Sequence, residues 1–237
     1  MRRLFRSFEQ SGLEYLLISG QATVLYGAAT FSEDVDIWIR PSPANARRLL
    51  TALARCRARV YRLTPRLTLR NLQAGHGFHF VVPGRPLETY LDVMGCPPRV
   101  GAFAAARRRA RSIATGWGTL PVVHPVDLVE IKKTRRLADY DVITNLAMLH
   151  LAEASQPGVS ALRWAARNTF RAEERAAILT RLGRPMTANG CAAEVSRDLA
   201  RLQAKDRAYW SRIVDELRAM RRGGSLLPDD LDVRAML

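Results

Sequence analysis

The sequence predicts a mixed α/β fold (α+β), with a sheet and flanking helices in its first part and helices alone in the rest. Up to about residue 150, short apolar runs rich in β-branched residues alternate with segments of helical periodicity. After Gln156-Pro157-Gly158, the periodicity is helical, with Arg and Glu on the polar faces. The length of 237 residues and the 48% hydrophobic content suffice for a substantial core. We therefore expect one domain over residues 1–154 and a helical C-terminal region over residues 155–237.

Turn residues bound each element expected in the first hundred residues. Ser19-Gly20 ends the first apolar run, Gly27 ends the short helix after it, and Pro41 ends the second run. Ser42 can cap the next helix, with Pro43 at its first position. The predicted elements are a strand over 14–18, a helix over 21–26, a strand over 35–39, a helix from 43 to about 57, and strands over 78–82 and 89–94.

The remaining elements are predicted in the same way. The Pro-Gly-Arg-Pro turn at 83–86 makes the strands on either side an antiparallel pair. Gly116-Trp117-Gly118 forms the bend of a hairpin over 112–123, and Pro125 opens the helix that follows. The expected helices run from 126 to about 136, through Ile143 to Leu151, from 161 to 182 and from 192 to 220, and residues 223–230 form a loop.

The charge balance is strongly positive, with 37 Lys and Arg against 22 Asp and Glu. Thirty-four of the 37 are Arg, a bias that is typical of GC-rich codon usage and so does not by itself indicate nucleic-acid binding. Between Asp36 and Glu88, however, the chain has ten Arg and no acidic residue. A field of this sign attracts phosphates, so tRNA or another polyanion stays a candidate partner beside the alternative of a solvated basic face.

Cysteine usage and hydropathy indicate the compartment. Cys56, Cys96 and Cys191 are odd in number and lack metal-binding or redox spacing, which predicts reduced thiols. No apolar stretch approaches the ~18 residues of a membrane span, and no signal-peptide run precedes Glu9. We expect a soluble, cytoplasmic protein with no membrane partner.

The chemistry is predicted by a Ser-Gly turn and by two aspartates that follow it. Asp34 and Asp36 stand at i and i+2 at the start of a strand, which places both carboxylates on one face about 7 Å apart. Two adjacent anions destabilise each other unless a cation lies between them, and Mg²⁺ accepts carboxylate and phosphate oxygens. Asp92, in a later strand, is expected beside them as a third ligand, so that two metal ions could be held. The Ser19-Gly20 turn leads into a helix N-terminus that suits an anionic phosphate.

At these residues the chain resembles the DNA polymerase β superfamily of nucleotidyltransferases. Within it, the chain is most similar to small bacterial proteins grouped with the AbiEii toxin and the minimal nucleotidyltransferases, over about residues 13–150. The resemblance implies that Asp34, Asp36 and Asp92 bind magnesium and catalyse transfer, and that Ser19 and Gly20 bind the triphosphate of the NTP. Two positions depart from the family pattern: Ser19 stands where the first Gly is expected, and Thr30 where many relatives have Arg.

The block from Asp127 to Asp141 resembles a helix that carries Lys, Arg and Asp in the same relatives, where it faces the nucleotide cleft. The resemblance implies that one lysine reaches the triphosphate. Lys132 and Lys133 lie 100° apart on a helix, and Lys132 shares a face with Arg136. We therefore favour Lys132 and Arg136 as nucleotide-binding residues, against the alternative that the block is an ordinary basic helix end.

Other conspicuous residues have plainer explanations. The four histidines, His76, His79, His124 and His150, lack metal-ligand spacing and are expected to be structural or exposed. The aromatic residues of the C-terminal helices, such as Trp164 and Trp210, are expected to belong to the core.

Three functions are consistent with these residues. The first is a Mg²⁺-dependent nucleotidyltransferase that moves an NMP from an NTP, such as ATP, to a hydroxyl of an RNA, a protein or a small molecule and releases pyrophosphate, as part of a toxin–antitoxin or defence system with a partner protein. The second is a catalytically weak nucleotide-binding or antitoxin-like module of the same fold, which Ser19 and Thr30 favour. The third is an RNA-binding protein that uses its basic surface. The intact Asp34, Asp36 and Asp92 favour the enzyme.

Overall fold

The computed structural model describes residues 1–84 and 87–236 and confirms the mixed α/β fold. Its main sheet has seven strands within those residues, in the order β3-β5-β6-β2-β1-β8-β7. The strands are β1 (Tyr15–Ile18), β2 (Val35–Ile39), β3 (Arg59–Val60), β5 (Gly77–Val82), β6 (Thr89–Met94), β7 (Arg111–Thr115) and β8 (Gly118–Val122). The pairs β2–β6 and β1–β8 are parallel and the others antiparallel, so the sheet is mixed.

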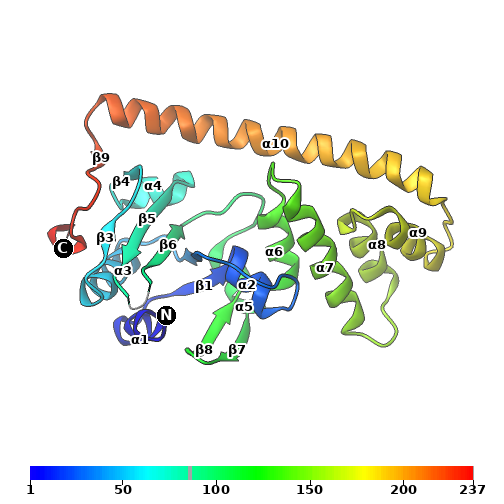
Figure 1. Ribbon diagram of the computed structural model, residues 1–237, viewed down its shortest axis with the longest axis horizontal. Helices are drawn as coiled ribbons and strands as arrows, with labels where there is room; N and C mark the ends of the chain where they lie inside the picture. The colour runs from blue at the N-terminus through cyan, green and yellow to red at the C-terminus, as the bar shows by residue number, and fades with distance from the viewer. Residues whose placement is uncertain (85–86, 237) are drawn as a thin grey trace.

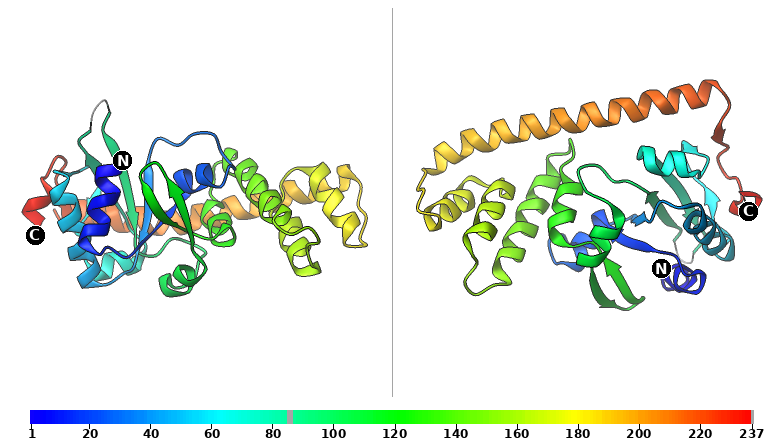
Figure 2. Two further views of the ribbon diagram at one scale, coloured as in Figure 1. Left: turned by 90° about the horizontal axis from the view of Figure 1, so that it is seen from below. Right: turned by 180° about the vertical axis from the view of Figure 1, so that it is seen from behind.

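Helices flank this sheet and then form the C-terminal region. They are α1 (Arg2–Ser11), α2 (Ser19–Leu25), α3 (Pro43–Arg55), α4 (Leu69–Ala74), α5 (Phe103–Arg109), α6 (Pro125–Lys132), α7 (Ala138–Ala152), α8 (Val159–Asn168), α9 (Ala172–Arg181) and α10 (Ala188–Arg222), with a 3₁₀ turn η1 (Val233–Met236). Helix α10 runs the length of the molecule, from α8 and α9 at one end to the edge of the sheet at the other (Figures 1 and 2). No helix in the described residues is both long enough and apolar enough to cross a bilayer.

The two faces of the sheet differ in chemistry. Phe78 and Phe80 of β5, Leu91 and Val93 of β6, and Ile37 of β2 are fully buried on one face. Because side chains alternate along a strand, the residues between them point to the other face, which carries His79, Asp92 and Asp36. The polar residues of this second face form the candidate site.

Two helical predictions were wrong in extent. The helix expected to reach about Arg136 ends at Lys132, because the backbone of Lys133 turns away at φ −72° and ψ 67°. The helix expected over 161–182 is two helices, α8 and α9. Between them, the backbone N–H of Phe170 donates to the hydroxyl of buried Thr144 at 2.8 Å, so a tertiary hydrogen bond stabilises the break.

Some elements were missed. Helix α1 is amphipathic, with Leu4, Phe5 and Phe8 buried, and this spacing was visible in the sequence. The segment expected to be a loop at 223–230 contains β9 (Leu226–Leu227), which pairs with β4 (Thr64–Pro65). The expected turn at 83–86 includes residues 85 and 86, which lie outside the described residues, but the strands on either side are antiparallel as predicted.

The C-terminal region shares the core of the sheet. Val195 of α10, Leu227 of β9 and Val233 of η1 belong to the same apolar cluster as the strands. The backbone N–H of Val60 donates to the carbonyl of Leu231 at 2.8 Å, which extends the edge of the sheet into the tail. The expected division at residue 154 stays a prediction.

We predict that Val233→Ala lowers the free energy of unfolding by about 2 kcal/mol, since it removes two buried methyl groups and leaves a cavity. Urea titration of the mutant and of Arg234→Ala, an exposed neighbour, would measure the difference. Equal stability of the two variants would show that the tail does not contribute to the core.

Candidate functional site

The parallel register of β2 and β6 determines the position of the carboxylates. Asp36 is directly opposite Asp92, so the two side chains leave the same face of neighbouring strands. Asp34 stands just before β2, two residues from Asp36 and exposed, whereas Asp36 is half-buried. The structure thus brings together the three acids that the sequence indicated; their catalytic and metal-binding roles stay predictions.

The three carboxylates are electrostatically unfavourable in the absence of a cation. The pKa of Asp36 is raised to about 7 by burial and by the charges of Asp92 and Asp34, which together outweigh a hydrogen bond from Ser19 and the charge of Lys132. Burial and the charge of Asp92 also raise the pKa of Asp34, while Arg62 and Arg136 lower it. The site therefore favours any ligand that adds positive charge between these oxygens.

A divalent cation fits the donor chemistry of this site. The donors are hard carboxylate oxygens on rigid strands, the kind that Mg²⁺ binds. Within the described residues, no group of three or more His, Cys, Asp or Glu side chains is arranged so that it could hold a metal ion. The fit thus rests on the type, charge and strand positions of the donors.

The first residues of α2 pack against the loop that leads to the carboxylates. A Cβ on Gly20 would lie 2.1 Å from the hydroxyl oxygen and 2.9 Å from the Cβ of Ser32, so a larger residue would require Ser32 to move. Gln21 reinforces this contact by donating to the carbonyl of Ser32 at 2.8 Å. Ser19 adopts φ 55°, in the left-handed region, at the position where the family pattern has Gly. A side chain there costs about 1–2 kcal/mol.

The basic segment lies near the acids, but not as one helical stripe. The ammonium of Lys132 donates to Asp139 at 2.8 Å, and its charge lowers the pKa of Asp36. Lys133 instead pairs with Glu130 at 2.5 Å. Arg136 lies beyond the end of α6, exposed, and its charge lowers the pKa of Asp34. The expectation that Lys132 and Arg136 share a helix face was therefore wrong, although both act on the carboxylates.

Helix α10 fixes this basic segment in place. Asp206 is buried and accepts from the backbone N–H of Arg135 at 3.0 Å and from the guanidinium of Arg99 at 3.2 Å. Arg99 also donates to the carbonyl of Glu130 at 2.9 Å, at the end of α6. No local sequence pattern indicates this arrangement, because its partners are 71 and 107 residues apart.

His79 belongs to the site, although its sequence context predicts a structural or exposed residue. It is opposite Asp92 in the β5–β6 pair, and its Nδ1 lies 2.7 Å from Oδ1 of Asp92. Because a carboxylate only accepts, Nδ1 is the donor. The signal was present, since pairing Val82 with Thr89 across the turn also pairs residues 79 and 92.

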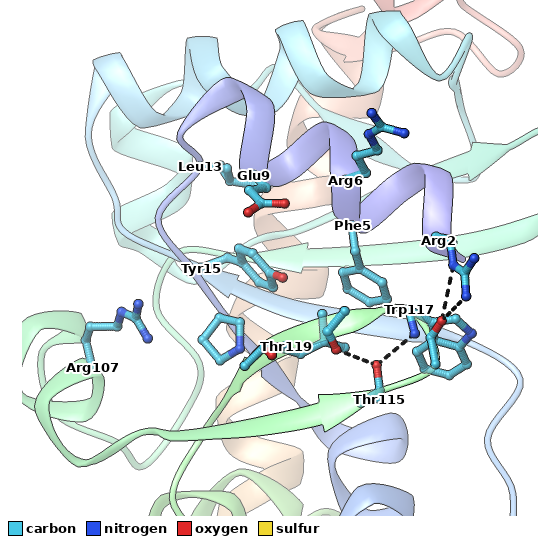
Figure 3. Close-up of a pocket in the computed structure, with 14 residues that line it drawn as sticks. Arg2, Phe5, Arg6, Glu9, Leu13, Tyr15, Arg107, Thr115, Trp117 and Thr119 are labelled. Carbon is cyan, nitrogen blue, oxygen red and sulfur yellow. Dashed lines mark hydrogen bonds between the residues drawn. The ribbon is translucent and has the colours of Figure 1, made fainter.

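A separate cavity lies away from these residues. It has a volume of about 700 Å³ and lies between α1, the start of β1 and the β7–β8 hairpin (Figure 3). Phe5, Tyr15 and Trp117 form its aromatic wall, with the rings of Phe5 and Trp117 stacked at 6.0 Å. None of the predicted site residues lines it.

Comparison with known proteins gives fold resemblances only. No protein family matches the chain, and no curated protein does. A crystal structure from H. pylori, described as a candidate nucleotidyltransferase, has a TM-score of 0.44 and 12% identity, covering 86% of this chain and 94% of its own. ANT(2″)-Ia in complex with adenylyl-2″-tobramycin has a TM-score of 0.37 and 13% identity, covering 89% and 95%. At these values neither structure assigns an activity to this chain.

The raised pKa of Asp36 predicts how Asp36→Asn changes stability. Because the folded-state pKa lies above the unfolded value, the folded state loses stability as pH rises from about 4 to about 7. The substitution removes that loss, so it should raise the melting temperature at pH 8 by at least ~2–4 °C, the shift that about 1 kcal/mol produces. At pH 4.5 the difference should be much smaller. Melting curves in EDTA at both pH values would test this, and a lower melting temperature of the variant at pH 8 would contradict it.

Proposed function

We propose that this protein transfers a nucleoside monophosphate from an NTP to a hydroxyl group with Mg²⁺ and releases pyrophosphate. The observation that supports this most is the pairing of Asp36 with Asp92 across β2 and β6, next to Asp34 and within reach of the charge of Lys132. Aligned carboxylates can bind the metal, and the nearby ammonium of Lys132 can bind the phosphates, of a metal–triphosphate complex.

Asp34, Asp36 and Asp92 would hold magnesium, which would supply Lewis-acid stabilisation of the phosphates. Lys132, held by Asp139, and Arg136 would neutralise the triphosphate, which Ser19 and Gly20 would also bind. His79 would orient Asp92 through its Nδ1 hydrogen bond. Catalysis would then be mostly positioning and electrostatic stabilisation.

The acceptor would be a hydroxyl of an RNA, a protein or a small molecule. A toxin–antitoxin or defence role, with tRNA or a partner protein, is part of the proposal. A second candidate is a catalytically weak nucleotide-binding or antitoxin-like module of the same fold. It is favoured by the strained Ser19, whose side chain occupies a position that suits Gly.

Asp34→Asn and Asp36→Asn should each abolish nucleotidyl transfer, because each removes a metal ligand charge. The assay would incubate the protein with labelled ATP, CTP, GTP and UTP, Mg²⁺ and total tRNA or lysate. Asp141→Asn, an exposed acid on α7, is the matched control and should retain activity. Full activity of either site mutant would exclude the two-metal assignment, and NTP binding without turnover in the parent would favour the second candidate.

The lysine pair provides an internal comparison. Lys132→Ala should weaken NTP binding by about 1.5–3 kcal/mol, the range for hydrogen bonds to charged groups. Lys133→Ala should cost under about 1 kcal/mol, since its ammonium is directed to Glu130. Titration with a non-hydrolysable NTP at fixed Mg²⁺, well below the melting temperature of each variant, would measure both. Small, equal effects would indicate that the basic segment is only a solvated face.

A further inference from the structure

An aromatic surface adjoins the carboxylates on the same face of the sheet. Tyr90 stands two residues before Asp92 on β6, so both side chains leave the same face about 7 Å apart. Because Val35 is paired with Leu91, the preceding residues Asp34 and Tyr90 lie level with each other. Tyr90 therefore lies beside the predicted metal ligands, toward β5.

Tyr61 and Arg62 complete this surface. The backbone N–H of Tyr61 donates to the carbonyl of His79 at 2.8 Å, which places Tyr61 alongside β5. Its ring centroid lies 4.9 Å from that of Tyr90, and the guanidinium of Arg62 lies 4.7 Å from its centroid. The charge of Arg62 acts on Asp34 and Asp92. We call Tyr61, Arg62 and Tyr90 the stacking platform.

The platform borders a cavity of about 350 Å³. The cavity is also lined by Arg59, Val60, Val81, Glu88, Asp229 and Asp230. Arg59 pairs with Glu88 at 3.2 Å and with Asp230 at 3.4 Å. Acidic groups thus balance the basic ones in the lining, so the cavity does not select phosphate by charge. Flat aromatic walls with a guanidinium and polar edges suit a planar heterocycle that carries hydrogen-bonding groups.

The backbone of Arg62 is held in a strained conformation. Its φ of 58° lies in the left-handed region, which residues with a side chain rarely adopt. Within the described residues its guanidinium makes no ion pair at 4 Å or less. The exposed guanidinium thus lies over the Tyr61 ring with no carboxylate partner among the described residues.

We propose that Tyr61, Arg62 and Tyr90 bind a nucleobase by stacking, immediately beside the carboxylates. The assignment of the neighbouring phosphate site rests on the proposed function. The proposed phosphate site lies toward β1 and β8: Ser19 and Gly20 follow β1, and Lys132 lies in the helix after β8. The platform lies on the other side of Asp92, toward β5. A base on the platform thus approaches from the side opposite the triphosphate, as the terminal base of a nucleic-acid acceptor would. The base of the NTP is the alternative ligand, because it has the same planar, hydrogen-bonding ring.

The experiment compares binding of a labelled six-nucleotide oligoadenylate RNA with an abasic strand of equal length, and of ATP with inorganic triphosphate. Tyr90→Leu and Arg62→Gly should weaken RNA binding roughly tenfold, since one base–aromatic stack contributes about that much. Tyr90→Phe keeps the ring and should bind like the parent. Arg57→Gly is the matched control, because Arg57 is also exposed and has φ 57°. Melting curves would verify that each variant is folded.

The outcomes separate the two sources of the base. Weaker RNA binding with unchanged ATP binding identifies the acceptor base. Weaker ATP binding with unchanged triphosphate binding identifies the base of the NTP. The proposal is overturned if Tyr90→Leu and Arg62→Gly bind both RNA and ATP as the parent does. It is also overturned if the parent binds RNA no better than the abasic strand and ATP no better than triphosphate. If the platform variants bind normally but Asp34→Asn loses nucleotidyl transfer, the proposed function is retained and only the base-binding role of the platform is rejected.

Discussion

The parallel pairing of β2 with β6 is the constraint on which the site depends. It aligns Asp36 with Asp92 and, because Val35 is opposite Leu91, it also brings the preceding residues Asp34 and Tyr90 close to each other. The same register buries Ile37 and Val93 on the opposite face, so a slip by one residue would exchange core and site. Apolar burial therefore fixes the position of charged groups that repel one another, and the strands keep carboxylates together that would separate in a flexible loop.

Local chemistry in the sequence predicted six of the seven described strands of the main sheet, all but β3, and it indicated the three acids. Pro43 after Ser42, for example, starts α3 as expected, and the hydroxyl of Ser42 accepts from the backbone N–H of Asn45. Contacts between distant segments could not be predicted in this way. The break between α8 and α9 depends on Thr144, and the end of α6 is followed by a backbone hydrogen bond to Asp206. Neither partner has a local sequence signal, because each is supplied by another helix.

Helix α10 connects the two ends of the molecule and also acts on the site. Glu216 lies 2.8 Å from buried His76, and Asp206 holds the segment that follows α6. The C-terminal region is thus a structural support for the basic segment, independently of where a domain boundary is drawn. Since Lys132 and Arg136 lie on either side of the residue that Asp206 binds, a displacement of α10 would change the positions of both cations.

The cations around the carboxylates are held in different ways. Lys132 donates to Asp139 at 2.8 Å, the exposed Arg136 lies 3.9 Å from the other oxygen of the same carboxylate, and Arg62 stacks on Tyr61. Together they lower the pKa values of Asp34 and Asp36, but burial and mutual repulsion still raise them. The protein thus leaves its acids only partly compensated. A site in this state gains more from binding a cation than a fully paired site would, because its carboxylates repel one another and Asp36 is already partly desolvated.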